Sequence, residues 1–331
     1  MPANLTPDYF KAEQWYREAT TAEEKILALE RMLAVMPKHK GTDHLKADLR
    51  RRLSALKEAG AHKGKGTGLD VFHIPRMGAG QVVLLGLPNS GKSSIVGLLT
   101  NAKVHIADFP FSTNAPVPGM MNFEGVHIQI VDMPPITADY IMPGQVGTYR
   151  NCDLIGIVID LSGDVEEQRR VCMDFLESRS LLANPQTAVY DERGNPGAPG
   201  LGKRALCICT KTDIETAGAF EKLKGGCRYP IEFVKVSTTT GEGLGELTRM
   251  IFEQLRIIRI YAKPPGKKPD MNEPFTMPAG STVMDLARTI HRELAEKLKT
   301  AKIWGEGVYS GQNVQRSHIL NDKDIVELHF A

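Results

Sequence analysis

The sequence predicts an α/β protein in which a mostly parallel sheet is covered by helices on both faces. The main observation is that short apolar runs alternate with helical segments between residues 81 and 254, which is typical of parallel strands joined by crossover helices. A helical hydrophobic period precedes this region, and strand-like runs grouped around one helix follow it. The expected domain boundaries are therefore 1–68, 69–256 and 257–331.

The first part, residues 1–68, is expected to contain a helical hairpin and a Gly-rich linker. Apolar side chains recur at helical spacing in two stripes, 26–33 and 45–56, which a Pro- and Gly-containing segment separates. The second helix is basic, because residues 37–66 contain nine Lys and Arg against three Asp and Glu, a net charge of +6. Two interpretations remain open for this charge: a solvated helix face and a patch that binds RNA phosphates.

The second part, residues 69–256, supplies the sheet. Helical patterns follow several of its apolar runs, near residues 93–99, 165–181 and 244–254. Residues 184–202 are too rich in Gly and Pro for a core element, so we expect a surface insertion there. The expected strands are 81–86, 127–132, 154–161, 205–210 and 231–236.

The third part, residues 257–331, is expected to be a small α+β module. Two strand-like runs flank a loop rich in Pro and Lys, a helical stretch follows, and the chain ends in short strand-like runs. Lys263, Lys267 and Lys268 surround the proline turn. Contact with phosphates and a solvated loop both account for these lysines.

Composition restricts the class of protein. The chain has 331 residues, of which 42% are hydrophobic, so a single small module and global disorder are excluded. Its 41 Lys and Arg against 39 Asp and Glu give a net charge of +2, so any nucleic-acid binding must come from a local patch. The five cysteines show no CxxC spacing, and we find neither a signal-peptide pattern nor an apolar run of about 18 residues. We expect a cytoplasmic protein with reduced thiols.

A phosphate-binding motif follows the first predicted strand. Residues 86–93 (GLPNSGKS) fit GxxxxGK[ST] and open a predicted helix, which predicts a P-loop NTPase fold. Glycines allow backbone N–H groups to converge on phosphate oxygens, Lys92 reaches the terminal phosphates, and the Ser93 hydroxyl is a hard ligand suited to Mg²⁺. A glycine turn with an exposed lysine is the alternative. The residues expected to contact nucleotide here are Asn89, Ser90, Gly91, Lys92, Ser93 and Ser94.

Two later strand ends indicate the metal and the base. Asp132 ends the second predicted strand, where a carboxylate is suited to hold Mg²⁺ opposite Ser93. The sequence TKTD ends the fourth, and the carboxylate of Asp213 can accept both the N1–H and the exocyclic amine of guanine, a donor pair that adenine lacks. The residues expected on the base side are Thr210, Lys211, Asp213, Ser237 and Thr238.

With these motifs, residues 38–331 resemble the developmentally regulated GTP-binding (DRG-like) proteins, GTPases of the Obg group. The matching stretches are KGTDHLKADLRRRL, GLPNSGKSS, ADFPFSTNAPVPG, VDMPP, TKTD and the tail from RIYAKPPGKKPD to LNDKDIVELHF, which resembles a TGS domain. The resemblance implies a Ras-like G domain, a ubiquitin-like TGS fold, and GTP, GDP and Mg²⁺ as ligands. It also implies that Thr113 is the switch I threonine, a metal ligand that acts with Lys92 in hydrolysis, and that RNA or the ribosome is a partner.

Two residues depart from the family pattern. Where DxPG is usual, residues 132–135 read Asp-Met-Pro-Pro, and Pro135 lacks the N–H that the glycine offers to the γ-phosphate. Ile136 stands where many small GTPases place a water-orienting glutamine, and an apolar side chain cannot orient water. Slow intrinsic hydrolysis is therefore expected.

Asn89 adds the prospect of a second cation. Several GTPases with asparagine at this place bind K⁺ beside the phosphates, where the ion stabilises developing negative charge. A local hydrogen bond that stabilises the turn is the alternative role for this side chain.

The sequence agrees with more than one function. The first is a Mg²⁺-dependent GTP hydrolase that works as a switch, with the helical and TGS parts transmitting the nucleotide state to RNA or the ribosome. The second is a GTP- or GDP-binding module for RNA with negligible hydrolysis, because Pro135 and Ile136 remove two usual elements of catalysis. A P-loop kinase for a small molecule is disfavoured by the guanine motif at 210–213.

Overall fold

The structure, a computed structural model, falls into two compact units. One comprises Met1–Val71 with Thr137–Gly144, and the other Phe72–Ile136 with Gln145–Ala331. The insertion expected at 184–202 lies, except for Gly202, outside the described residues. The residues that the structure describes are 7–19, 22–36, 43–61, 71–100, 115–137, 141–142, 144–182 and 202–330.

Helices build the first unit. α2 (Ala22–Ala34) and α3 (Asp43–Ala61) are the expected helical pair, and α1 (Pro7–Glu18) is an addition that the sequence analysis did not predict. The apolar positions of α1 are aromatic residues and alanines rather than a leucine stripe. Tyr9 and Ala12, one turn apart, are buried in one core with Leu29 and Met32 of α2 and Leu49 of α3.

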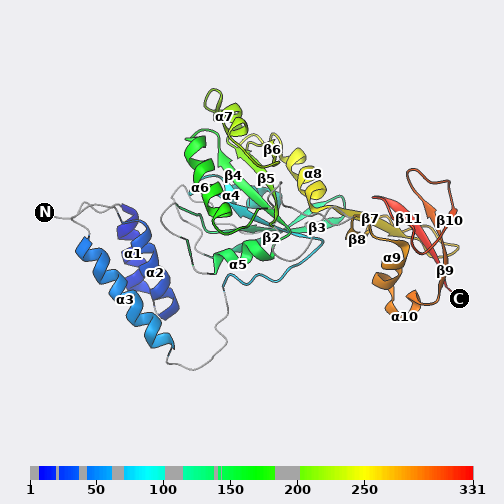
Figure 1. Ribbon diagram of the computed structural model, residues 1–331, viewed down its shortest axis with the longest axis horizontal. Helices are drawn as coiled ribbons and strands as arrows, with labels where there is room; N and C mark the ends of the chain where they lie inside the picture. The colour runs from blue at the N-terminus through cyan, green and yellow to red at the C-terminus, as the bar shows by residue number, and fades with distance from the viewer. Residues whose placement is uncertain are drawn as a thin grey trace. The chain divides into compact units, whose positions relative to one another are not determined.

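The larger sheet of the second unit has the strand order β2-β3-β1-β4-β5-β6 (Figure 1). Neighbouring strands are parallel except for β2, which runs antiparallel to β3. The sequence analysis missed β2, because this edge strand contains Pro118 and Gly119 and only part of it is buried. The strands are β1 (Gln81–Leu85), β2 (Val117–Phe123), β3 (Val126–Asp132), β4 (Leu154–Asp160), β5 (Arg204–Thr210) and β6 (Glu232–Lys235).

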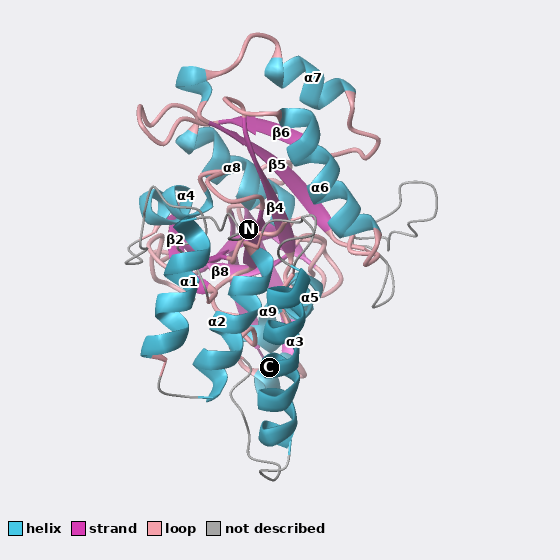
Figure 2. Cartoon of the chain, turned by 90° about the vertical axis from the view of Figure 1, so that its left-hand side faces the viewer, coloured by secondary structure: helices cyan, strands magenta, loops and turns pink. Residues whose placement is uncertain are grey.

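Helices cover both faces of this sheet (Figures 1 and 2). α4 and α8 pack on one face, where Ile95 and Ile251 share a core with Leu84. α6 packs on the other face, where Cys172 lies near Cys207 of β5. The helices are α4 (Lys92–Leu99), α5 (Gln145–Asn151), α6 (Val165–Glu177), α7 (Ala219–Gly225) and α8 (Leu244–Leu255).

The C-terminal part of this unit forms a smaller sheet with the order β10-β9-β11-β7-β8. β7 and β11 are parallel, and the other neighbouring pairs are antiparallel. Thr282 and Asp285 form a capping box that begins α9, whose Leu286 packs against this sheet. The elements are β7 (Ile257–Ala262), β8 (Phe275–Pro278), α9 (Val283–Ile290), α10 (Arg292–Ala295), β9 (Leu298–Trp304), β10 (Gln312–Val314) and β11 (Asp324–Phe330).

Arg259 of β7 links the smaller sheet to the turn between β2 and β3. Its side chain is only 5% exposed. The guanidinium donates to both carboxylate oxygens of Asp322 and to the carboxylate of Glu124 in that turn. It also lies over the ring of Phe252 in α8, 4.6 Å from the ring centroid. One buried cation thus holds together segments from both sheets.

Candidate nucleotide-binding site

The loop between β1 and α4 has the conformation of a phosphate cradle. Gly91 has a φ of 92° and Asn89 a φ of 60°, both in the left-handed region. A Cβ on Gly86 would lie 2.6 Å from the Val158 carbonyl oxygen, and one on Gly91 would lie 3.3 Å from a Thr210 methyl group. The glycines at both ends of the motif are therefore required by close packing and by backbone conformation.

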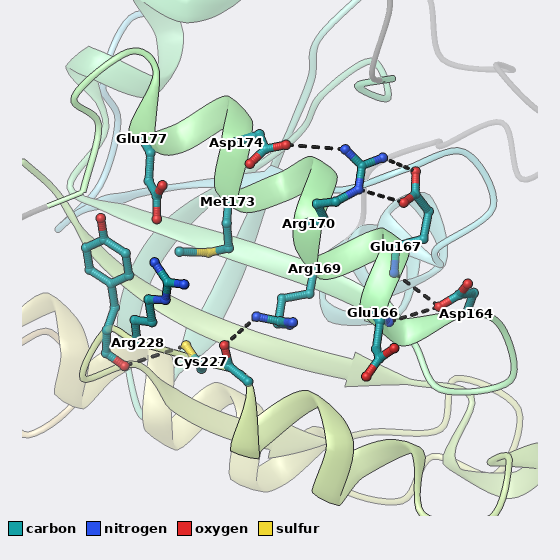
Figure 3. Close-up of a pocket in the computed structure, with 12 residues that line it drawn as sticks. Asp164, Glu166, Glu167, Arg169, Arg170, Met173, Asp174, Glu177, Cys227 and Arg228 are labelled. Carbon is teal, nitrogen blue, oxygen red and sulfur yellow. Dashed lines mark hydrogen bonds and ion pairs between the residues drawn. The ribbon is translucent and has the colours of Figure 1, made fainter.

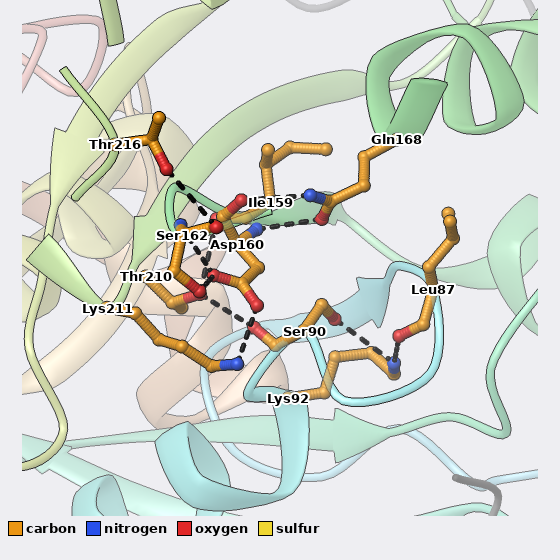
Figure 4. A network of polar contacts seen from close by, with 10 residues as sticks. All are labelled: Leu87, Ser90, Lys92, Ile159, Asp160, Ser162, Gln168, Thr210, Lys211 and Thr216. Carbon is orange, nitrogen blue, oxygen red and sulfur yellow. Dashed lines mark hydrogen bonds and ion pairs between the residues drawn. The ribbon is translucent and has the colours of Figure 1, made fainter. Parts of the chain in front are cut away.

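Lys92 is buried inside this loop and is surrounded by neutral acceptors. Its Nζ donates to the carbonyl oxygen of Leu87 at 2.7 Å and to Oγ of Ser90 at 3.3 Å (Figure 4). It also donates to the carbonyl oxygen of Gly86 at 3.1 Å. Burial lowers the pKa of Lys92 to about 8, although the nearby Asp132 carboxylate opposes this effect. Among the described residues, the hydrogen-bond partners of this buried ammonium are all neutral oxygens, so the ammonium is suited to receive a phosphate group.

Ser93 and Asp132 meet at the same edge of the sheet. The Ser93 hydroxyl donates to Oδ2 of Asp132 at 2.5 Å, and the Asp132 side chain is fully buried at the end of β3. Hydroxyl and carboxylate oxygens are hard metal ligands, so this pair fits Mg²⁺. Among the described residues, no group of three or more His, Cys, Asp or Glu side chains is placed to hold a metal. A cation here would need oxygens from a nucleotide or water as well.

The base-side residues are tied to the phosphate loop through β5. Thr210 donates from Oγ1 to the Ser90 carbonyl oxygen at 2.7 Å, and Lys211, with a φ of 58°, pairs through Nζ with Asp160 at 2.6 Å (Figure 4). The exposed Asp213 accepts a hydrogen bond from the buried Ser237 hydroxyl at 2.6 Å. Ser237, which follows β6, thus fixes the Asp213 side chain that would contact the base.

The remaining predicted site residues have different placements. Ser94 is a half-buried residue of the first turn of α4, and Thr238 is a half-buried residue of the loop after β6. Thr113 lies in 101–114, outside the described residues. The structure therefore brings together the predicted residues of the phosphate loop, Asp132 and the base-side loops, whereas the switch I threonine remains a prediction.

The segment after Asp132 packs onto the start of the phosphate loop. The Ile136 N–H donates to the Gly86 carbonyl oxygen at 3.2 Å, and the Ile136 side chain is fully buried. Gln145, the buried first residue of α5, donates from Nε2 to the Pro134 carbonyl oxygen at 2.6 Å. This glutamine lies close to residues 132–136, the segment that corresponds to switch II in the resemblance, but its amide already holds the backbone there.

Sequence reasoning missed Asp160 and Gln145. Asp160 accepts from Lys211, from the Ser162 hydroxyl at 2.6 Å and from the Ser162 N–H at 2.8 Å. It ends β4, so the rule that carboxyl ends of parallel strands carry the site residues would have found it. Gln145 lies in a helix that the sequence analysis did not predict, and no signal in its surroundings indicated a role.

A pocket of about 540 Å³ on the G domain is not the nucleotide site (Figure 3). It lies between α6 and the turn after α7, where Arg170 pairs with Glu167 and Asp174, and Arg169 donates to the Gly226 carbonyl oxygen. Among the described residues, those that line it include none from the phosphate loop or the 210–213 motif. Of the described residues, five carboxylates and three arginines line the pocket, a negative surplus that does not suit a phosphate ligand.

Comparisons with known proteins found two matching families as well as similar sequences and structures. The family described as "50S ribosome-binding GTPase" matches residues 81–189, and the TGS domain family matches residues 258–329. The developmentally-regulated GTP-binding protein 2 homolog of Dictyostelium discoideum is 26% identical over 92% of this chain and 98% of its own. The ribosome-interacting GTPase 1 of Saccharomyces cerevisiae is 27% identical over 93% of this chain and 99% of its own. A solved GTP-binding protein from Pyrococcus horikoshii, 13% identical with a TM-score of 0.48, covers 76% of this chain and 100% of its own.

The fold and the two family matches define a P-loop GTPase with a C-terminal TGS domain. Within that class, the chain is similar to the DRG-like GTP-binding proteins, with which it aligns over more than nine-tenths of its length. The resemblance, the fold class and the GTP-binding function predicted from the sequence are therefore confirmed. Among the helices that the structure describes, we find none long and apolar enough to cross a membrane.

Proposed function

We propose that this protein is a slow, Mg²⁺-dependent GTP switch that acts together with RNA or the ribosome. The observation that carries the proposal is the buried Lys92. The acceptors that its Nζ contacts in the described part of the chain are all neutral, and the glycines of its loop leave room for phosphate oxygens. Residues 89–94 bind the phosphates. Asp213 selects guanine, and Thr210, Lys211, Ser237 and Thr238 support it.

Mg²⁺ would be held by Ser93 and Asp132 together with nucleotide oxygens, and would neutralise charge on the β- and γ-phosphates. Thr113 joins them when GTP is bound, and its release after hydrolysis reports the nucleotide state. Lys92 contributes to catalysis by stabilising the charge that develops on the transferred phosphoryl group. This role requires the ammonium form, which burial has made less stable in the nucleotide-free protein.

Switch II supports slow hydrolysis. Pro135 has no N–H for the γ-phosphate, and Ile136 uses its own N–H on the Gly86 carbonyl and buries its side chain. Replacing Pro135 with glycine restores a donor. We expect Pro135→Gly to raise the affinity for a non-hydrolysable GTP analogue relative to GDP several-fold, by about 1 kcal/mol, and an unchanged ratio would show that Pro135 does not limit sensing.

K⁺ activation is a further part of the proposal. Asn89 is exposed at the tip of the loop in the left-handed conformation, so its amide oxygen is available beside the phosphate position. Asn89→Gly retains that backbone conformation and removes only the amide. We expect this variant to lose the difference between hydrolysis in K⁺ and in Na⁺, while GDP affinity stays the same.

The parts flanking the G domain are the proposed output elements, with boundaries at 1–68, 69–256 and 257–331. Residues 137–144, which follow the switch II segment, group with residues 1–71 in one compact unit. One relative is named as a ribosome-interacting GTPase, which supports an RNA or ribosomal partner, and such a partner would place the protein in the cytoplasm.

The deciding experiment is multiple-turnover phosphate release with purified protein, in K⁺ and in Na⁺, with and without ribosomes. We expect slow release alone and faster release with K⁺ or ribosomes, both abolished in Lys92→Ala. If the wild type releases no more phosphate than Lys92→Ala in any condition, the proposal that this protein hydrolyses GTP is refuted.

The second candidate is a GTP- or GDP-binding RNA module without hydrolysis, which Pro135 and Ile136 favour. Retained guanine-nucleotide affinity without turnover would establish this candidate. Loss of the preference for GTP over ATP in Asp213→Asn would confirm the base contact in either case.

A further inference from the structure

A groove of about 810 Å³ opens in the TGS domain where α9, α10 and the segment after β10 meet. Arg288, Arg292 and Arg316 line it, and Glu296 is the acidic residue among its described lining. The lining therefore carries three positive charges against one negative, a surplus of +2. Residues 257–331 as a whole contain eleven Lys and Arg and nine Asp and Glu, the same surplus. The excess positive charge of this domain is thus concentrated in the groove.

The three arginines come from separately fixed pieces of backbone. The Met284 N–H of α9 donates to the Arg316 carbonyl oxygen at 2.9 Å, and the Val283 N–H donates to the His318 carbonyl oxygen at 3.0 Å. These two bonds hold Arg316 beside the first turn of α9, while Arg288 lies one turn farther along. His291, in an extended conformation, ends α9, so Arg292 begins a separate helix. The positive charges are spread along the groove on a rigid framework.

These guanidiniums are available to a ligand. All three residues are exposed. Arg288 has an ion pair with Asp285 at a long 3.6 Å, and its side chain is 63% exposed. Arg292 and Arg316 form no ion pair with any residue that the structure describes. Lys263 differs, because it pairs with the buried Glu327 and lies over the ring of Trp304 at 4.6 Å.

The lining favours a phosphate backbone as the ligand. Within the described residues, the groove has no aromatic side chain, and its apolar contributions are the half-buried Met284 and the buried Ala295. A folded protein partner would need large apolar anchors, and base recognition would need stacking surfaces. Several free guanidiniums in an open groove are suited to successive phosphodiesters, which accept two hydrogen bonds from each arginine.

We propose that the groove formed by Arg288, Arg292 and Arg316 binds the phosphate backbone of RNA. The inference rests on the proposed RNA- or ribosome-linked function, and it assigns the contact between this protein and RNA to one surface of the TGS domain. Binding here is independent of base sequence, because no base-reading side chain lines the groove, and it weakens steeply with salt because counterions return to the RNA.

The test uses the full chain loaded with GDP and a fluorescent, unstructured RNA, with dissociation constants measured by anisotropy between 50 and 200 mM KCl. In R288Q/R292Q/R316Q we expect affinity at the lowest salt to fall at least about tenfold, and the slope of log K against log salt to become shallower by about 2, since each single-strand phosphate contact contributes roughly 0.7. These positions are exposed, so thermal unfolding should stay unchanged.

The matched control is R170Q/R228Q/R249Q, which removes the same charge from the surface of the G domain. It should retain the wild-type slope. An equal loss of RNA affinity in both triple variants would overturn the inference, because it would show that RNA binding depends on net charge and not on the groove. RNA binding by the wild type that the groove variant fully retains would refute the inference but not the proposed function. No RNA binding by the wild type would refute the inference together with the RNA-binding part of the proposed function, whereas GTP hydrolysis is tested separately by phosphate release. A preference for polyglutamate over RNA at the groove would refute the inference and identify an acidic protein partner instead.

Discussion

Lys92 and Arg259 are both buried cations of the second unit, yet they have opposite surroundings. Lys92 donates to two carbonyl oxygens and one hydroxyl, and burial lowers its pKa to about 8. Arg259 donates to two carboxylates, and its hydrogen bonds to Asp322 and Glu124 raise its pKa above the usual value although burial opposes this. Carboxylates accept hydrogen bonds from Arg259, whereas the described hydrogen-bond acceptors of Lys92 are all neutral.

The difference separates a binding site from a structural junction. A buried charge without a directly hydrogen-bonded counter-ion costs folding free energy, and binding of an anion recovers this cost. A buried charge with two carboxylates contributes to stability without any ligand, and removing it leaves those carboxylates uncompensated. Variants of the two residues should therefore affect different measurements.

Replacement of Arg259 should give the largest loss of stability. We expect Arg259→Ala to lower the free energy of unfolding by about 2–3 kcal/mol. This lies below the usual value for a buried pair, because Asp322 and Glu124 are partly exposed and screened by solvent. Urea unfolding without nucleotide measures it, and Arg249→Ala on the exposed side of α8 should change stability by less than about 0.5 kcal/mol. A similar loss of stability in both variants would show that the contacts of Arg259 with Asp322 and Glu124 contribute no more than an exposed arginine does.

Replacement of Lys92 should act on the ligand and not on the fold. We expect Lys92→Met to weaken GDP binding by about 2 kcal/mol, roughly 30-fold, because a charge-assisted hydrogen bond to phosphate is lost. The free energy of unfolding without nucleotide should change by less than about 1 kcal/mol, since a costly buried charge and its neutral contacts disappear together. A stability loss as large as that of Arg259→Ala would contradict the comparison.

The sequence predicted one member of this pair and not the other, for a physical reason. Phosphate binding needs glycines, a lysine and a hydroxyl at fixed local spacing, so a motif of eight residues predicts the position of Lys92. The partners of Arg259 lie 135 and 63 residues away, at Glu124 and Asp322, and no local pattern connects them.

The same distinction applies to the rest of the site and the fold. Asp132 and Asp213 follow apolar runs and could be predicted, whereas the contact of Lys211 with Asp160, 51 residues away, required the register of β4 and β5. Central strands were predicted because they are continuously apolar. The edge strand β2 and the aromatic helix α1 lack such a pattern.

Alkaline pH should have opposite effects on ligand binding and stability at Lys92. Because the folded pKa of about 8 lies below the ordinary value of 10.5, the folded protein loses this proton before the unfolded chain does. Between these values the unfolded state binds more protons, so stability without nucleotide rises with pH, by at most about 1.4 kcal/mol per unit.

GDP affinity should instead fall, by up to about tenfold per unit above pH 8, because phosphate requires the charged lysine. Both effects are measured as differences from Lys92→Met between pH 7 and 9.5, and Lys92→Arg, which does not titrate, should lack them. Parallel pH curves for wild type and Lys92→Met would contradict the assignment.

The smallest effect is expected for the contact of Arg259 on the exposed side, with Glu124 in the β2–β3 turn. Glu124 is half-exposed and accepts from Arg259 and, at 3.3 Å, from Lys323, and these contacts lower its pKa. We expect Glu124→Gln to cost only about 0.5–1 kcal/mol in urea unfolding at pH 7, because solvent screens exposed pairs. The cost should disappear at acidic pH: a carboxyl with a lowered folded pKa stabilises the protein above its unfolded pKa and loses this effect as pH falls through the folded value. Asp322→Asn, which removes the inner carboxylate, should cost more. Equal costs for the two variants would mean that Arg259 is held from the β2–β3 turn as strongly as from within the TGS domain.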